Sequence, residues 1–249
     1  MSKITIIAEA GINHCGNMNL AKELASASKE CGADIFKTKL FSLDKLFSHK
    51  KVMVRGKNWY KEVKQTELTR GQLFELAYHC NKIGIELMAS AFDMERLDWL
   101  EEIGVRRHKI ACRMSKDEAY LKEVEVTGKD MLISIPYGKL ENSALIRCMA
   151  PKDWPWKRTT LMYSIPEYPT LLHELKLGQV NWRLYEGFSD HTVGIEASIV
   201  ALSRGARIIE KHFKLEGQKD SDGLDIACSI TPKEMAELVR FARTVEQVL

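Results

Sequence analysis

Two histidines occupy matched positions late in the chain, His191 in the run S-D-H-T and His212 in the run E-K-H-F. Each follows a short apolar segment typical of a β-strand. If these strands are neighbours, the imidazoles converge, and closure of a barrel brings Glu9, at the end of the first such segment, next to both. Two imidazoles and a carboxylate with open coordination positions suit a divalent transition metal such as manganese, iron or zinc. A histidine at a strand end can also simply pack or bond the backbone, but the matched pair favours a metal site.

Lysines lie inside several strand-like segments, where an ammonium group is costly to bury unless it is paired. Lys37 and Lys39 are two residues apart and therefore share one face of a strand, and Lys109 stands in a different strand. Inward-facing ammonium groups make a site for a phosphate or a carboxylate. Two other interpretations stay open. Each lysine could pair with an internal acid such as Glu9 or Glu210, or burial could free an amine for a Schiff base.

Further polar groups stand at the predicted strand ends. Ser90 ends one strand close to Asp93, and Ser189 precedes Asp190 at the end of another. His14, in G-I-N-H-C-G, follows the first strand. We expect His14 to be a turn residue, with a ring at the rim of a site as the alternative.

These residues are distributed over a regular alternation of strands and helices. Short apolar, β-branched runs predict strands at residues 4–9, 34–40, 85–91, 108–112, 131–135, 159–165, 185–190 and 207–213. Helical patterns occupy residues 17–31, 70–83, 94–103, 116–126, 140–149, a short stretch after Pro169, 194–204 and 232–249, and a charged excursion covers 42–67. Strict alternation implies parallel strands, and about eight units favour a closed (β/α)₈ TIM barrel over an open doubly wound sheet. No G-x-G-x-x-G follows the first strand, and the active site of a barrel lies at the carboxyl ends of its strands.

Length and composition agree with one such domain in the cytoplasm. The chain has 249 residues and a net charge of +3, too balanced to indicate nucleic acid as its main partner. The six cysteines are irregularly spaced with no C-x-x-C pair, so we expect free thiols in a reducing compartment. Neither a signal peptide nor a run of 18 apolar residues is present, so we expect no secretion and no membrane span.

Several motifs, in order along the whole chain, resemble those of one known family. They are A-E-A-G-I-N-H (8–14), G-A-D-I-F-K (32–37), E-L-T-R-G-Q-L (67–73), G-I-E-L-M-A-S-A-F-D (84–93), H-K-I-A (108–111), Y-P-T (168–170), G-F-S-D-H-T-V-G-I-E-A (187–197) and I-E-K-H-F-K-L (209–215). The first is similar to the A-E-I-G-I-N-H opening of the N-acetylneuraminate (sialic acid) synthase family. The late pair S-D-H-T and E-K-H-F is the most specific part of this resemblance.

The resemblance implies a (β/α)₈ barrel that condenses phosphoenolpyruvate with an amino-sugar aldehyde of the N-acetylmannosamine type, releasing phosphate and a sialic-acid-type nonulosonate. It implies a divalent metal on His191 and His212, Mn²⁺ with Mg²⁺ or Co²⁺ as alternatives, which would polarise the aldehyde. It implies Glu9 as the catalytic glutamate, acting on the attacking water. The residues implied for phosphoenolpyruvate are Lys37, Ser90, Lys109, Ser134 and Ser189, and those implied at the sugar end are Lys39, Tyr168 and Asp225.

The chain departs from the family pattern at three places. Where the family has K-F-Q, Lys39 replaces the glutamine that contacts the sugar. Where the family has K-I-G-S-G-E, a hydroxyl becomes the thiol of Cys112 and an acid becomes Met114. Where the family has T-N-x-Y-P, Pro166 replaces a phosphate-binding asparagine. Lys39 and Arg113 add positive charge, which would serve a more anionic sugar.

Two other functions compete with the synthase. A lysine Schiff-base aldolase on the same barrel needs no metal, but the sixth strand, residues 159–165, contains no lysine. A non-catalytic relative that binds a sugar or a partner is favoured by Met114 and Pro166 and opposed by the retention of Glu9 and the two motif histidines. From the resemblance we also expect residues 1–249 to be a single barrel domain without the family's small C-terminal antifreeze-like domain, and to form a homodimer.

Overall fold

The computed structural model describes residues 3–47, 49–54, 56–136 and 156–248. The strands of its main sheet are β1 (Thr5–Gly11), β2 (Ile35–Leu40), β5 (Glu86–Ala91), β6 (Arg107–Ile110), β7 (Asp130–Pro136), β8 (Thr159–Ser164), β9 (Tyr185–Asp190) and β10 (Ile208–His212). The longer helices are α1 (Met18–Glu30), α4 (Arg70–Ile83), α5 (Met94–Glu102), α6 (Glu118–Val126), α8 (Glu196–Ser203) and α9 (Pro232–Val248).

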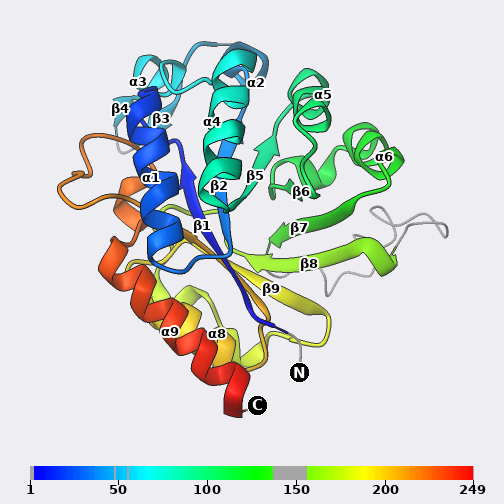
Figure 1. The fold of residues 1–249 in the computed structure, drawn as a ribbon, viewed down its shortest axis with the longest axis vertical. Helices are drawn as coiled ribbons and strands as arrows, with labels where there is room; N and C mark the ends of the chain where they lie inside the picture. The colour runs from blue at the N-terminus through cyan, green and yellow to red at the C-terminus, as the bar shows by residue number, and fades with distance from the viewer. Residues whose placement is uncertain (1–2, 48, 55, 137–155, 249) are drawn as a thin grey trace.

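The eight strands form one parallel sheet in the order β5-β2-β1-β10-β9-β8-β7-β6. The end strands β5 and β6 lie side by side, so the sheet curls into a nearly closed barrel. Figure 1 shows the helices on the outside of the strands and the two ends of the chain at the same end of the molecule. The predicted (β/α)₈ fold is therefore confirmed, because each helix returns the chain to begin another parallel strand.

Local signals set the helix ends where the sequence predicts them. The Asn17 side chain accepts hydrogen bonds from the backbone at the start of α1. Thr69 and Gln72 form a capping box at the start of α4. That helix ends at Gly84, whose φ of 72° lies in the left-handed region that glycine adopts without a Cβ clash.

The charged excursion between β2 and α4 contains local structure that the sequence pattern did not predict. Its short elements are α2 (Leu43–Leu46), β3 (Met53–Val54), β4 (Lys57–Asn58) and α3 (Tyr60–Lys64), with β3 and β4 paired as an antiparallel hairpin. Trp59 and Tyr60 pack there against a small cluster of buried apolar residues that includes Phe41 and Val63. The predicted helix at 140–149 lies outside the described residues.

Short 3₁₀ turns make up the remaining elements: η1 (Met114–Lys116), η2 (Trp156–Arg158), η3 (Leu172–Glu174), η4 (Leu177–Gln179) and η5 (Ile226–Cys228). The stretch after Pro169 is thus two such turns rather than one α-helix. None of the described helices has the length and apolar character that crossing a bilayer requires.

Candidate active site

The interior of the barrel changes abruptly from apolar to polar along the strands. Near its middle, a small apolar cluster consists of Ile7, Ile35, Met88, Leu132 and Met162, with Ile208 partly buried against it. Side chains two apart on a strand share a face, so the next inward position on each of these strands is two residues further along. Those positions hold Glu9, Lys37, Ser90, Ser134, Ser164 and Glu210, all of them buried. We call these six residues, together with the buried Lys109 of β6 and Ser189 of β9, the polar ring.

The polar ring lines a cavity of about 390 Å³ at the carboxyl ends of the strands. His191, His212, Lys39, Tyr168 and Asp225 line the same cavity. Every residue that the sequence predicted for substrate or metal therefore reaches one space. This is the end of the barrel at which barrel enzymes carry out their chemistry.

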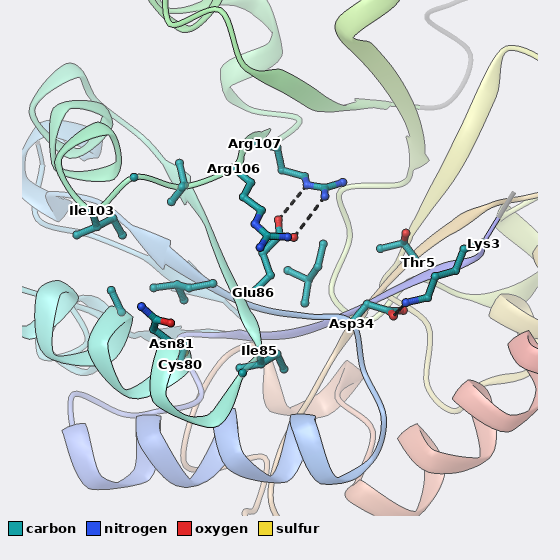
Figure 2. Close-up of a pocket in the computed structure, with 16 residues that line it drawn as sticks. Lys3, Thr5, Asp34, Cys80, Asn81, Ile85, Glu86, Ile103, Arg106 and Arg107 are labelled. Carbon is teal, nitrogen blue, oxygen red and sulfur yellow. Dashed lines mark hydrogen bonds and ion pairs between the residues drawn. The ribbon is translucent and has the colours of Figure 1, made fainter.

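A second cavity, of about 650 Å³, lies at the opposite end of the barrel. Figure 2 shows two ion pairs in it: Arg107 donates two hydrogen bonds to Glu86, and Lys3 pairs with Asp34. It is larger than the first cavity, but it has none of the predicted site residues. We therefore place the chemistry in the smaller cavity.

Two lysines and two glutamates of the polar ring form one buried charge cluster. The Nζ atom of Lys37 lies 2.8 Å from Oε2 of Glu9 and 3.6 Å from Oε2 of Glu210. The Nζ atom of Lys109 lies 3.7 Å from the same Glu210 oxygen and donates to Ser134 Oγ at 2.6 Å. The predicted pairing of lysines with internal acids is thus present, and the lysines still line the cavity.

The environment shifts the pKa values of Glu9 and Glu210 in opposite directions. Burial raises the pKa of Glu9, and the Glu210 carboxylate adds to this rise while Lys37 opposes it. Burial alone would also raise the pKa of Glu210, but Lys109 and Lys37 beside it bring that pKa down to about 2. Glu210 is therefore a permanent anion, whereas Glu9 holds protons more readily and can exchange them. Burial lowers the pKa of Lys109 as well.

The two motif histidines converge at the cavity, with ring centroids 5.5 Å apart. Nδ1 of His191 donates to the backbone carbonyl of Ile165 at 2.7 Å, which leaves Nε2 as the unprotonated nitrogen. Nδ1 of His212 is buried without a hydrogen-bond partner among the described residues. Burial lowers the pKa of His191 to about 4 and that of His212 well below its ordinary value. Both rings are therefore neutral at neutral pH, the form that binds metals.

Tyr168 covers both imidazoles. Its ring stacks on His191 at 4.1 Å between centroids and meets His212 edge-on at 5.5 Å. No group of three or more His, Cys, Asp or Glu side chains in the described part of the chain is arranged to hold a metal ion. Two neutral imidazoles are nevertheless ligands that a divalent transition metal would accept.

Comparison with known proteins assigns the chain to a family. The model of the NeuB family matches residues 24–249. The chain belongs to the NeuB family.

Among NeuB relatives, the N,N′-diacetyllegionaminic acid synthase of Campylobacter jejuni is 31% identical over 263 residues, covering 100% of this chain and 78% of that protein. The N-acetylneuraminate-9-phosphate synthase of Mus musculus is 29% identical, covering 98% and 70%. The crystal structure of the N-acetylneuraminic acid (sialic acid) synthetase from Leptospira borgpetersenii, in complex with citrate, superposes with a TM-score of 0.86 at 27% identity, covering 99% and 85%.

Most positions at which the chain departs from the NeuB pattern line this cavity, whereas Met114 packs in the hydrophobic core. Lys39 is not a free cation, since its Nζ lies 2.7 Å from Asp225 Oδ2. Arg113 stacks on the Phe47 ring at 4.6 Å and lines the cavity. Cys112 and Pro166 line the cavity as well.

Two members of the polar ring were not among the predicted site residues. Glu210 was expected only as a possible partner for a lysine, and Ser164 was not predicted at all, whereas Ser134 was implied by the family resemblance. His14 is 1% exposed and its Nδ1 accepts a hydrogen bond from the Gly16 backbone. It does not line the cavity, which confirms the turn interpretation.

Proposed function

We propose that this NeuB chain is an enzyme that condenses phosphoenolpyruvate with an N-acetylmannosamine-like amino-sugar aldehyde to a sialic-acid-type nonulosonate, with release of phosphate. The observation that carries this proposal is the polar ring beneath two neutral histidines: a base lined by lysines and hydroxyls for an anion and a place above it for an electrophile. Relatives of this chain that are synthases of N,N′-diacetyllegionaminic acid and of N-acetylneuraminate 9-phosphate support the same class of reaction.

The lysines and serines of the polar ring would bind phosphoenolpyruvate. Lys37 and Lys109 are buried in the cavity, and Ser134 already accepts a hydrogen bond from Lys109. Ammonium groups in a site shielded from water stabilise phosphate and carboxylate charge more strongly than they do in bulk solvent. Their intramolecular partners, Glu9 and Glu210, keep the empty cluster close to neutral.

Glu9 is placed to act on water. Its raised pKa brings this carboxyl group closer to the pH at which a general base works best. In the proposed reaction, carbon 3 of phosphoenolpyruvate attacks the aldehyde carbon and water adds to carbon 2. Glu9 takes a proton of that water, and the aldehyde oxygen, which becomes an alkoxide, is protonated. The tetrahedral intermediate then forms the keto group at carbon 2 as its C–O bond to phosphate breaks, and the phosphate leaves with the hydroxyl proton.

His191 and His212 would hold a divalent metal, for which we propose Mn²⁺. When bound, such a metal supplies Lewis-acid polarisation of the sugar carbonyl. The chain's own contribution is to keep both imidazoles neutral and to orient His191 through the carbonyl of Ile165. Tyr168, stacked on His191, shields this place from solvent on one side.

The test is phosphate release from phosphoenolpyruvate by the purified protein with Mn²⁺, over a panel of N-acetylated and anionic aldoses. We expect release that requires both a sugar and the metal, and that a chelator or His191→Ala abolishes. Borohydride treatment with a keto substrate should leave the protein unmodified. Covalent trapping would instead favour a Schiff-base aldolase using Lys109, whose pKa burial lowers.

Absence of phosphate release across the panel, from a folded protein that binds Mn²⁺, would refute the synthase and favour a sugar- or partner-binding relative. We further propose that the enzyme works in the cytoplasm as a homodimer. Light scattering of the purified protein tests the homodimer, since the mass of a monomer would contradict it.

A further inference from the structure

Ser164 is the one hydroxyl of the polar ring whose position no sequence motif predicted. It ends β8, is 0% exposed and lines the cavity. Its Oγ atom has no hydrogen-bond partner of normal geometry among the described residues. Buried hydroxyls are nearly always hydrogen-bonded, so an unpartnered one facing a cavity indicates a ligand atom that completes it.

The neighbours of Ser164 belong to the anion-binding part of the ring. Its register partners are Ser189 on β9 and Pro136 on β7, and Ser134 stands two residues before Pro136. Residues in register on parallel strands project to the same side of the sheet. Ser189 Oγ donates to Glu210 at 2.9 Å and Ser134 Oγ accepts from Lys109, so both of these hydroxyls already have partners, in contrast to Ser164.

The Ser164 hydroxyl contacts the thiol of Cys112. Burial raises the pKa of Cys112, and hydrogen bonding with Ser164 partly offsets that rise. Sulfur is a weak hydrogen-bonding atom, so this contact leaves the hydroxyl available to a stronger acceptor. Cys112 and Pro166 are also the positions at which the chain lacks the hydroxyl and the asparagine of the NeuB pattern. Ser164 contacts the first and precedes the second by two residues.

We propose that Ser164 donates a hydrogen bond to an anionic oxygen of phosphoenolpyruvate and replaces the polar groups that are missing at Cys112 and Pro166. This inference rests on the proposed function and names a residue that the function did not require. A hydroxyl whose protein contact is with a weakly bonding sulfur loses little when it turns to a charged oxygen, and hydrogen bonds to charged groups are the stronger kind.

The experiment measures binding of phosphoenolpyruvate by isothermal titration, without sugar, to the wild-type protein and to Ser164→Ala. We expect the dissociation constant to rise about tenfold in the variant, the usual effect of losing one hydrogen bond to a charged group. The thermal unfolding temperature should fall little, because the contact that the deleted hydroxyl makes is with the weakly bonding Cys112 sulfur. In turnover, KM for phosphoenolpyruvate should rise while KM for the sugar stays unchanged.

Two further variants make the test specific. Cys112→Ser places a hydroxyl beside the lost one and should restore most of the affinity in the Ser164→Ala background. Ser203→Ala, on the outer helix α8, removes an exposed hydroxyl that bonds only the helix backbone and should change nothing. Inorganic phosphate and pyruvate, titrated separately, distinguish the two anionic groups, because only the fragment that Ser164 contacts should bind more weakly to Ser164→Ala.

Equal affinity of the wild type and Ser164→Ala, within twofold, would overturn the inference and leave the proposed function intact. A wild-type protein that binds no phosphoenolpyruvate, with or without Mn²⁺, would overturn the proposed function itself and the inference with it.

Discussion

The Nζ atom of Lys39 lies 2.7 Å from Oδ2 of Asp225, across a sequence separation of 186 residues. Burial alone would lower the pKa of Lys39, but Asp225 beside it raises that pKa. The pair joins β2 to the segment after β10 at the edge of the cavity. Lys39 replaces a sugar-contacting glutamine of the NeuB pattern, and the added charge is neutralised inside the protein. The interpretation of Lys39 as a free cation for an anionic sugar therefore loses its basis.

We predict that Lys39→Met raises KM for the sugar about tenfold, equivalent to about 1.4 kcal/mol, because Asp225 is left without its cation and becomes easier to protonate. KM for phosphoenolpyruvate should change little. Steady-state kinetics with each substrate varied in turn measure both constants. Lys122→Met, at an exposed position of α6, is the matched control. A rise confined to phosphoenolpyruvate would contradict the placement of Lys39 at the sugar end.

Removal of either motif histidine should weaken metal binding independently of activity. We expect His191→Ala and His212→Ala each to raise the dissociation constant for Mn²⁺ by at least about tenfold, since changes around metal ligands already cost that much. Titration calorimetry without substrates measures this, and Mn²⁺ should no longer raise the unfolding temperature of either variant. His79→Ala, whose ring contacts Ser26 on the outer helices, should bind like the wild type. An unchanged affinity for Mn²⁺ in both histidine variants would show that the metal does not bind at this site.

Glu9→Gln should separate binding from chemistry. The amide keeps the shape of the side chain next to Lys37 but cannot take a proton from water. We predict a fall in kcat of about 100-fold or more, with much less change in the affinity for phosphoenolpyruvate. Rapid-quench measurement of phosphate release under single-turnover conditions tests the step directly. A variant that turns over at the wild-type rate would show that Glu9 only pairs with Lys37.

Lys211 and Asp190, each next to one of the motif histidines in the sequence, form a fully buried ion pair. Lys211 Nζ lies 3.3 Å from Asp190 Oδ1, and Asp190 also accepts hydrogen bonds from Thr192 and Ser198. Lys211→Met would leave Asp190 as an uncompensated buried charge, so we predict a loss of about 3–5 kcal/mol in the free energy of unfolding. Urea denaturation measures it. Arg70→Met, which breaks an exposed ion pair with Glu102, is the control and should have little effect.

Asp34, at the end of the barrel opposite the candidate active site, should make the free energy of unfolding depend on pH. Burial alone would raise the pKa of Asp34, but hydrogen bonds from Lys3, Ile6 and Arg243 lower it overall. A carboxyl group with a lowered native pKa stabilises the fold above its unfolded-state pKa, and this stabilisation is lost as pH falls through the native pKa.

Asp34→Asn should therefore lower the free energy of unfolding by roughly 1–3 kcal/mol at pH 7, and the difference from the wild type should shrink below about pH 4. Urea denaturation of both proteins at pH 7, 5 and 3.5 measures it. A difference that stays constant over this range would show that the charge of Asp34 is not the cause.

Much of the barrel could be predicted because its signals are local. The β-branched runs, the cap at Thr69 and the left-handed Gly84 act within a few residues, and the structure has them where expected. The hairpin of β3 and β4 was missed because its strands are two residues long, too short for an alternation of side chains to be visible. Trp59 packs against residues outside that segment, and such packing cannot be read from the local sequence.

The site was predicted residue by residue but not in its pairings. Alternation along strands and the S-D-H-T and E-K-H-F motifs indicated which side chains point inward. Whether Lys37 pairs with Glu9 or with Glu210 depends on the stagger between neighbouring strands, which only the closed barrel defines. Ser164 was not predicted as a site residue, because a single serine at a strand end carries no signal until its neighbours in the polar ring are known.

The sequence by itself determined the order and type of the elements, the inward face of each strand and the family motifs, since these depend on spacing of 2.0 and 3.6 residues and on side-chain chemistry. The tertiary structure decided the electrostatics. Closure of the sheet brought Lys39 to Asp225, placed Glu210 between two lysines, buried both histidines and left the Ser164 hydroxyl with only the Cys112 thiol beside it. Charge interactions and desolvation depend on distances between residues far apart in the chain, and only the folded barrel sets those distances.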